Sequence, residues 1–409
     1  MLDFSDQPYR WFPPRRSGLF AWALGHYNRY VYLPRRREIE NVRVTGQLDA
    51  IRERTSRDRL LFLPNHPTHD DAYIWMEALR QLGVSTHIMA AYDVFLRSRL
   101  NAFVMQRMGC FSVDREGSDQ QAMKQAIETL TQGHHALTIF PEGNVYLQND
   151  VVTPFHEGAA FLALRGARAL AEEKGRVLAV PVSIKVTHVV DVRDPLSHRL
   201  HRLAEALASP VKADHPPLEK VKRVGLTALA KNLRHRGHNV PEAPELAELV
   251  KQAAETVIAR LEAKMELTPG LEDSLIDRIR RARKVVHEIR SDPERAHEHT
   301  LAAHWADEAM LAFRIASYSG NYLQARPTID RFAETIEKLS EDVYARAHPP
   351  VGRREALVHF GEPIDLTEHL EARPRQAAQA VTAAAEQAVQ RGLDQLNAEN
   401  DRVGARLWE

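Results

Sequence analysis

Apolar runs of strand length alternate with helical segments from about residue 40 to residue 190, and this alternation limits the possible folds more than any other feature. Strands are predicted at 39–44, 60–63, 87–91, 110–113, 136–140 and 177–186. Helices are predicted between them at 71–82, 94–108, 118–132 and 158–174. Strands that alternate with helices of this length indicate a sheet covered on both faces. The sequence therefore predicts an α/β fold with a mixed, largely parallel sheet flanked by helices.

Local signals set several boundaries in this region. Thr68 or Asp70 is a suitable N-cap for the helix 71–82, which should end at Gly83. Ser118 is the expected cap of the next-but-one helix. Pro181 lies inside an apolar strand, and a proline there suggests an edge strand or an irregularity.

The pattern becomes helical after about residue 195. Helices are predicted at 243–266, 271–290, 294–318 and 327–346, followed by a strand at 356–360 and a last helix at 374–398. A large helical insertion between two strands of one sheet is the simplest explanation. The expected division is an N-terminal aromatic and basic segment at 1–37, an α/β core at 38–195, the insertion at 196–346, and a closing strand with its helix at 347–409.

Composition excludes several classes of function. Lys plus Arg and Asp plus Glu both number 55, so overall charge gives no reason to expect nucleic acid. The single cysteine, Cys110, excludes an intramolecular disulfide framework and a cysteine-rich zinc site, and it suits a reducing compartment. No apolar run is long enough for a transmembrane helix, and no signal peptide is expected.

The N-terminal segment mixes aromatic side chains with arginines. Tyr, Trp and Phe recur between residues 8 and 37, and seven arginines accompany them. Aromatic rings with a basic fringe suit a membrane interface, where the rings lie at headgroup level. A helix that packs its rings onto the domain would have the same composition, so both interpretations stay open.

A histidine and an aspartate follow the predicted strand 60–63 in the segment Asn65-His66-Pro67-Thr68-His69-Asp70-Asp71. Histidine is readily poised as a general base, and a carboxylate on its other ring nitrogen fixes the tautomer. Such a pair suits deprotonation of a hydroxyl that attacks an activated acyl group. The other interpretations are a histidine in a capped loop and a metal-dependent hydrolase site built from His66, His69, Asp70 and Asp71.

Further candidate residues follow other predicted strands. Arg115 comes after strand 110–113, where its guanidinium suits a phosphate or carboxylate. Glu142 and Gly143 come after strand 136–140, at the rim where open α/β sheets bind ligands. A surface ion pair and an ordinary turn are the structural alternatives. The segment Pro154–Ala159 opens the helix 158–174, for which ordinary packing is favoured.

The order of these segments resembles the glycerolipid acyltransferase superfamily, which includes glycerol-3-phosphate and 1-acylglycerol-3-phosphate acyltransferases. Asn-His-x4-Asp at 65–71, Gly-Cys-Phe-Ser-Val-Asp-Arg at 109–115, Phe-Pro-Glu-Gly at 140–143 and Val-Pro-Val at 180–182 appear in the family's order. Gly-Glu-Pro-Ile at 361–364 resembles the closing strand. The resemblance covers about residues 38–190 and 351–368.

The resemblance implies a role for each matched residue. His66 would be the general base, with Asp71 orienting it. The acceptor would be bound by Arg115 and by residues around the Glu-Gly turn, and the acyl chain would lie near the proline of the last motif; the implied substrate-binding residues are Asn65, Arg115, Glu142, Gly143, Asn144 and Pro181. His69 would be a spacer within the motif.

Two departures from the family pattern affect the acceptor. An arginine commonly follows the Phe-Pro-Glu-Gly block, whereas this chain has Asn144-Val145-Tyr146, so the expected phosphate site lacks a second cation. The helical insertion is the other departure, and its role is open: a lid, a dock for a carrier protein or an oligomer interface.

The resemblance predicts a fatty O-acyltransferase in phospholipid biosynthesis. The donor would be acyl-CoA or acyl carrier protein as a co-substrate, with no metal or bound cofactor. The acceptor would be a lysophosphatidate-like or glycerol-phosphate-like lipid precursor. The expected location is cytoplasmic, peripheral on the inner face of the cell membrane. The alternative is a catalytically silent lipid-binding or scaffold protein on the same fold.

Overall fold

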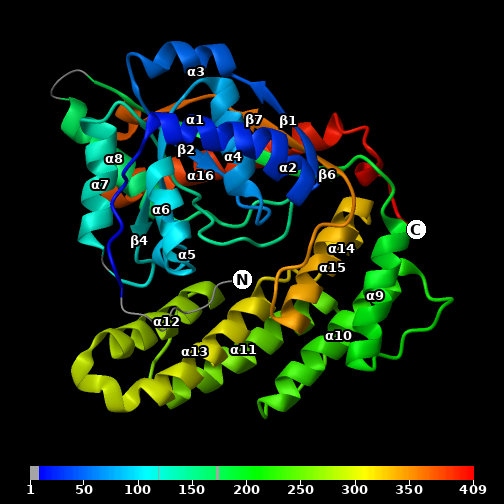
Figure 1. Ribbon diagram of the computed structural model, residues 1–409. Coiled ribbons are helices and arrows are strands. Elements are labelled where there is room, and N and C mark those ends of the chain that lie inside the picture. Colours follow the sequence, from blue (N-terminus) through cyan, green and yellow to red (C-terminus); the bar gives the residue numbers. More distant parts are fainter. Residues whose placement is uncertain (1–8, 118, 172–174) are drawn as a thin grey trace.

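The computed structural model describes residues 9–117, 119–171 and 175–409. Its centre is an eight-stranded sheet of order β1-β7-β6-β2-β5-β3-β4, with β8 paired to β6 (Figure 1). The strands are β1 Ile39–Gly46, β2 Arg59–Pro64, β3 Thr86–Ala91, β4 Cys110–Val113, β5 Ala136–Thr138, β6 Val177–His188, β7 Arg354–Phe360 and β8 Ile364–Asp365.

The pairing within this sheet is mixed but largely parallel. Strand β6 pairs in parallel with β2 and antiparallel with β7 and β8, whereas the remaining pairs are parallel. The predicted fold class is confirmed. Strand β7 follows the helical region in sequence yet lies directly beside β6, with Arg354 opposite His188. The chain thus leaves and re-enters the sheet at neighbouring positions.

Helices cover both faces of the sheet. On one face, α2 (Leu33–Arg36), α3 (Leu48–Thr55) and α4 (Asp71–Leu82) bury apolar residues that include Leu33, Ile51 and Trp75. On the other face, α7 (Gln120–Thr131), α8 (Gly158–Ala171) and α16 (Pro374–Ala398) enclose an alanine-rich core. Strand β6 is buried along its whole length, as a strand covered on both faces should be.

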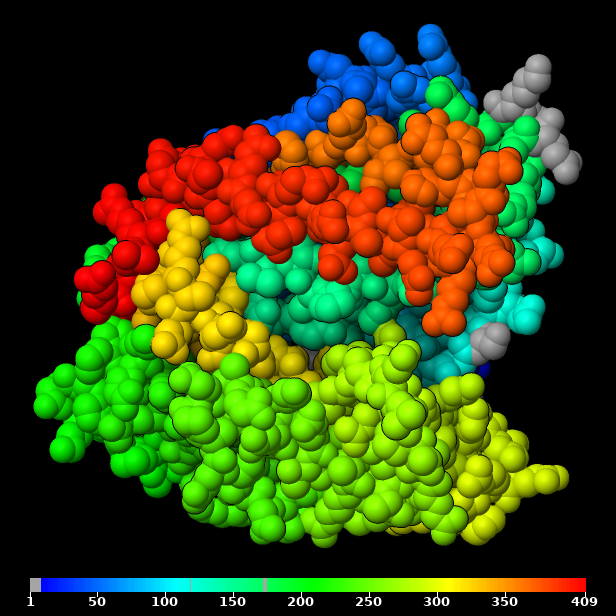
Figure 2. Space-filling model, turned by 180° about the vertical axis from the view of Figure 1, so that it is seen from behind, coloured from blue at the N-terminus to red at the C-terminus, as the bar shows by residue number. Residues whose placement is uncertain are grey.

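The insertion is a set of helices with apolar cores of their own. Figure 2 shows its helices as a layer beside the α/β core, with residues near 140–155 between that layer and α16. They are α9 Arg193–Leu207, α10 Pro217–His235, α11 Leu246–Lys264, α12 Leu275–Ser291, the 3-10 helix η2 Pro293–Glu298, α13 His299–Ala316, α14 Tyr322–Ala325 and α15 Ile329–Tyr344.

The remaining elements are short or lie near the N-terminus. They are α1 Gly18–Tyr27, the π-helix η1 Asn28–Tyr32, α5 Tyr92–Leu96, α6 Arg99–Met108, and the 3-10 helices η3 Leu366–His369 and η4 Val403–Ala405. Among the residues that the structure describes, no helix has both the length and the apolar character needed to span a bilayer.

Two predicted helices are divided in the structure. The predicted helix 294–318 begins as the 3-10 helix η2 and continues as α13. The predicted helix 94–108 is two helices, α5 and α6, because the Ser98 hydroxyl caps α6 by accepting a hydrogen bond from the Asn101 amide at 3.0 Å. The predicted cap Ser118 lies outside the described residues. The carboxylate of Asp119 caps α7, accepting from the Ala122 amide at 2.9 Å.

Pro181 lies in a central strand, so the edge-strand interpretation was wrong. The other interpretation, an irregularity in the strand pairing, is confirmed. One side of β6 pairs continuously with β2. On the other side, β8 pairs with Leu178 and Ala179, and β7 pairs from Val182 onward. Pro181 occupies the change of partner, where its missing N–H costs no ladder bond and its carbonyl accepts from the Gly361 amide at 2.9 Å.

Candidate active site

The candidate residues lie at one edge of the sheet. Strands β2, β4 and β5 belong to the parallel part of the sheet, so their carboxyl ends face the same side. His66 follows β2, Arg115 follows β4 and Glu142 follows β5. This is the edge at which open α/β sheets bind ligands.

His66 and Asp71 form a direct pair. The His66 Nδ1 and Asp71 Oδ2 atoms are 2.7 Å apart. Asp71 is the first residue of α4, is fully buried, and also accepts from the Thr68 amide at 3.1 Å. The His66 side chain is 26% exposed, and its ring packs on Phe140 with centroids 4.6 Å apart. With Nδ1 bonded to the carboxylate, Nε2 is the nitrogen left to act on a substrate.

Electrostatics keep this imidazole neutral near pH 7. Burial lowers the pKa of His66 to about 4; the Glu142 carboxyl opposes that shift, and His69 and Arg115 add to it. Burial also raises the pKa of Asp71, although the hydrogen bond from the Thr68 amide lowers it. A neutral imidazole held by a carboxylate can accept a proton at Nε2.

Glu142 holds the loop that carries His66 in place through hydrogen bonds. Its Oε1 atom accepts a hydrogen bond from the His66 amide at 2.8 Å, and its Oε2 atom accepts from the hydroxyl and the amide of Thr153. The side chain is buried, and this burial raises the pKa of Glu142 to about 7 although the hydrogen bonds from Thr153 and His66 oppose it. Sequence reasoning missed Thr153, which no motif marks.

Asn65 fixes the same loop to β6. Its side-chain amide donates to the Ile184 carbonyl at 3.0 Å, and its Oδ1 atom accepts from the Ile184 amide at 2.6 Å. The residue is buried. These bonds use both the NH2 group and the oxygen of the Asn65 side chain within the protein. Asn65 therefore holds the loop in place on β6.

Arg115 reaches the turn that follows Glu142. Its Nη1 atom donates to the Gly143 carbonyl at 2.9 Å and to Asn144 Oδ1 at 3.3 Å, while Nη2 lies 3.3 Å from Asp93. Gly143 has φ +70°, and a Cβ there would lie 3.0 Å from the His156 ring. Arg115, Gly143 and Asn144 therefore lie together, whereas the predicted site residue Pro181 is buried in β6.

The helix α15 of the insertion also contacts the His66 loop. His69 Nε2 lies 2.9 and 3.0 Å from the carboxylate oxygens of Glu341. His69 is therefore more than a spacer within the motif. Sequence reasoning missed Glu341, because nothing local links residues 272 positions apart.

Asp70 points away from His66. Its carboxylate binds Arg354, whose Nη2 donates at 2.8 Å, and it also pairs with Arg37. The side chains of His69 and Asp70 thus have separate partners and do not converge with His66 and Asp71 on one point. Within the described residues, no group of three or more His, Cys, Asp or Glu is arranged to hold a metal ion.

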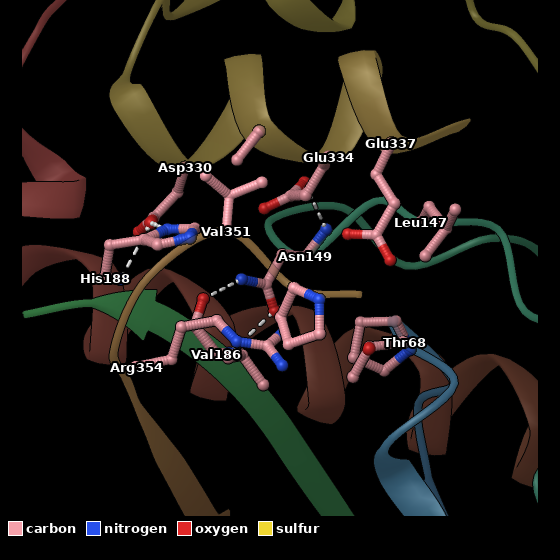
Figure 3. A pocket seen from close by; sticks show the side chains of 13 residues that line it. Thr68, Leu147, Asn149, Val186, His188, Asp330, Glu334, Glu337, Val351 and Arg354 are labelled. Atoms are coloured by element: carbon pink, nitrogen blue, oxygen red, sulfur yellow. Dashed lines mark hydrogen bonds and ion pairs between the residues drawn. The ribbon is translucent and has the colours of Figure 1, made fainter. Parts of the chain in front are cut away.

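A small cavity lies between this loop, β6 and α15. Its volume is about 30 Å³, enough for one or two water molecules and far too small for an acyl chain. In Figure 3 Asp330, Glu334 and Glu337 extend from α15 toward Thr68, Asn149 and Val186 of the core. Its lining is rich in polar groups, so it marks the contact between insertion and core.

Comparison with known proteins identifies the core. The sequence model of the Acyltransferase family matches residues 38–185. This part of the chain is an acyltransferase domain of the glycerolipid acyltransferase superfamily. The match supports acyltransferase activity in general, and it ends within β6, before the insertion. No curated protein matches the chain.

Proposed function

We propose that the protein is a glycerolipid-type O-acyltransferase, with His66 as general base and Asp71 as its orienting carboxylate. The observation that carries this proposal is the 2.7 Å contact between His66 Nδ1 and the buried Asp71, made at the edge of an acyltransferase domain. The donor is an acyl thioester, acyl-CoA or acyl carrier protein. The acceptor is a hydroxyl of a lysophosphatidate-like or glycerol-phosphate-like lipid precursor.

The chemistry needs only the groups already described. His66 Nε2 takes the proton of the acceptor hydroxyl as its oxygen forms a bond to the thioester carbonyl carbon. The tetrahedral intermediate then collapses, the C–S bond breaks, and the imidazolium returns the proton to the leaving thiolate. Asp71 stabilises the imidazolium while it exists. A thioester is activated already, so positioning supplies much of the rate.

An anionic acceptor is supported by Arg115. Its guanidinium reaches the Gly143 carbonyl next to Glu142, whose carboxylate in turn holds the His66 amide. A phosphate near this turn would sit beside the base. A glycerol phosphate places a phosphate close to a free hydroxyl, so it matches this arrangement better than a neutral alcohol does.

A membrane surface is the proposed source of the acceptor. Helix α1 contacts both η1 and α6, and the exposed apolar side chains of these three elements are here called the aromatic patch: Leu19, Trp22, Tyr27, Tyr30, Leu100 and Phe103. Arg29 stacks on Tyr30 and Arg107 on Phe103, each 5.3 Å from the ring centroid. Rings with arginines suit an anionic interface, so we place the protein in the cytoplasm, peripheral on the inner face of the cell membrane.

The second candidate is a catalytically silent lipid-binding or scaffold protein. It is favoured by the altered segment Asn144-Val145-Tyr146 after the Phe-Pro-Glu-Gly block, which lacks the expected arginine. The intact His66–Asp71 pair argues against it.

Acyl transfer from labelled acyl-CoA or acyl carrier protein to lysophosphatidate separates the two candidates. The wild-type protein should transfer the label, and His66→Ala should reduce kcat by about 10³-fold or more, because the proton then has no acceptor. His201→Ala is the matched control, since that histidine is exposed on α9. No transfer by the wild-type protein, with vesicle binding retained, would favour the scaffold.

A further inference from the structure

The helix α12 of the insertion brings an arginine to the acceptor side of the active site. The Arg280 guanidinium contacts the ring nitrogens of His156. His156 belongs to the loop after Glu142: its amide donates to the Pro141 carbonyl at 2.9 Å, and its ring lies against Gly143. Arg280 therefore reaches the turn that follows the Phe-Pro-Glu-Gly block.

Arg115 reaches the same turn from the core. It donates to the Gly143 carbonyl and to Asn144 Oδ1. Two arginines 165 positions apart in sequence (280 − 115) thus approach the two ends of the segment 143–156, and the charges of both lower the pKa of His156. The segment Asn144-Val145-Tyr146 lacks the arginine that the family pattern has after Phe-Pro-Glu-Gly, and Arg280 is a cation that contacts the loop following this block.

The charge on Arg280 is poorly balanced within the protein. Other cations here have close carboxylates: Arg283 pairs with Glu116, and His287 lies 2.9 Å from Asp114. Among the ion pairs of the described residues, the only one that Arg280 makes is with Asp277, at 4.0 Å and on the same exposed helix face.

The contact with His156 does not balance the positive charge of Arg280 either. Burial lowers the pKa of His156 to about 4, and the Arg280 charge pushes in the same direction, so the imidazole is neutral. The Arg280 side chain is 43% exposed. A cation that is accessible, held in place and weakly paired is suited to bind an anion.

We propose that Arg280 and Arg115 together bind the phosphate of the acceptor, so that the insertion completes the acceptor site of the core. This inference rests on the proposed acyl transfer for the identity of the ligand. The insertion would then contribute to acceptor specificity. The sequence of the insertion alone gave no sign of this role.

The position of the loop favours the acceptor over the donor as the source of the phosphate. The turn begins at Glu142, which bonds the His66 amide at 2.8 Å, so an anion bound there lies beside the base. In lysophosphatidate the phosphate and the reacting hydroxyl are on neighbouring glycerol carbons. In an acyl thioester the phosphates lie a whole pantetheine arm from the reacting carbonyl.

Steady-state kinetics of Arg280→Ala with two acceptors test this inference. The acceptors are a water-soluble short-chain lysophosphatidate and the matching monoacylglycerol, which lacks the phosphate. KM for lysophosphatidate should rise about tenfold, because the variant loses one charge-assisted hydrogen bond at a partly exposed site. KM for monoacylglycerol and for the acyl donor should not change. Arg280→Lys should recover part of the loss and serves if the alanine variant does not fold.

Lys284→Ala is the matched control. Lys284 is one turn further along α12, and its ion pair is with Glu288 on the same helix. The two alanine variants lose the same charge from the same helix, but only one loses a contact with the core. Lys284→Ala should leave both acceptor constants unchanged.

Three results would overturn the inference. An equal rise in KM for both acceptors would make Arg280 a structural latch between insertion and core. A rise in KM for the donor would assign the cation to the donor phosphates. No change in a folded variant would remove Arg280 from the site.

Calorimetric binding of the short-chain lysophosphatidate, without donor, separates this inference from the proposed chemistry. Weaker binding to Arg280→Ala than to wild type supports the anion site even where the wild-type protein transfers no acyl group. Equal binding by both proteins contradicts the anion site even where transfer occurs.

Discussion

At the scale of single residues, the site depends on where two adjacent carboxylates point. Asp71 faces His66 and is fully buried, whereas Asp70 faces Arg354 and Arg37. The first residue of α4 therefore reaches the His66 loop, and the residue before it reaches the sheet edge near β7. Of the two aspartates, only Asp71 is therefore placed to orient His66, which is the role proposed for it.

Asp71→Asn should lower kcat on the order of 10³-fold with little change in KM. The amide cannot stabilise an imidazolium, and its NH2 group can hold His66 in the wrong tautomer. Steady-state rates with saturating donor measure the effect, and a thermal melt checks that the variant folds.

Asp70→Asn is the control for that change. It weakens a buried ion pair, so we expect loss of stability by roughly 2–4 kcal/mol with kcat close to wild type. If Asp71→Asn keeps wild-type kcat, or if Asp70→Asn loses as much kcat while folded, the assignment of the two carboxylates is wrong.

At the scale of elements, α4 and α16 have the bounds that the sequence predicts. Short-range signals suffice for α4: an apolar face and a stop at Gly83 in the left-handed region. The predicted side-chain cap was wrong, because Asp70 occupies the N-cap position but its carboxylate binds Arg354 and Arg37. The strand-end motifs lie at one edge of the sheet, as expected, because parallel strands align their carboxyl ends. These predictions use only information within a few residues of each element.

The helix α15 shows why the insertion contacts could not be predicted. Its buried face includes Asp330, Arg331, Lys338 and Glu341, which a hydrophobic pattern assigns to solvent. Their partners come from distant segments: Asp330 binds His188, and Arg331 binds Asp150 at 2.8 Å. Only the tertiary structure shows these pairs, and the same holds for Glu341 and Arg280.

Glu334 on α15 should make stability depend on pH. Burial raises the pKa of Glu334 to about 8 from a usual 4.5, and the Asp150 charge adds to the shift. Below pH 4.5 Glu334 is protonated in both the folded and the unfolded chain, so it does not affect the unfolding free energy. As the pH rises from 4.5 toward 8, the unfolded chain ionises first and the unfolding free energy decreases. The Glu334 Oε2 atom accepts from the Asn149 amide at 3.0 Å and the Tyr322 hydroxyl at 2.6 Å.

Glu334→Gln should remove this pH dependence, because one amide oxygen can accept both hydrogen bonds. The unfolding free energy of the variant relative to wild type should increase between pH 5 and pH 8.5 by on the order of 2 kcal/mol. Urea unfolding at the two pH values measures it. Glu205→Gln, at an exposed acid on α9, should give no such change. A pH-independent difference for Glu334→Gln would contradict the buried-acid interpretation.

At the scale of the whole molecule, the insertion contacts the edge of the sheet that carries the candidate site without interrupting the sheet. It starts after His188 and ends before Arg354, which are opposite each other in neighbouring antiparallel strands. The helix α15 contacts the His66 loop, and α12 contacts the loops after β4 and β5. The residues proposed for acceptor binding and for catalysis thus come from segments that pack around separate apolar cores.

The aromatic patch gives the whole molecule one surface suited to a lipid bilayer. Trp22 on α1 and Leu100 on α6 are 63% and 71% exposed, and the two helices are joined by an edge-on contact between Phe20 and Phe103. Because α6 packs beside β4, docking this patch on a bilayer would keep the acyltransferase core at the lipid surface. An apolar patch with a basic fringe should bind anionic vesicles more strongly than neutral ones.

The double variant Trp22→Ala/Leu100→Ala should bind anionic vesicles roughly tenfold more weakly than wild type, since each truncation removes apolar area that the bilayer would bury. Co-sedimentation with phosphatidylglycerol-containing vesicles measures the change. Leu271→Ala is the control, because that side chain is fully exposed on the insertion. Added salt should weaken wild-type binding further by screening the arginines. Unchanged vesicle binding by the double variant, with transfer to micellar acceptor intact, would show that the protein meets its lipid through another surface.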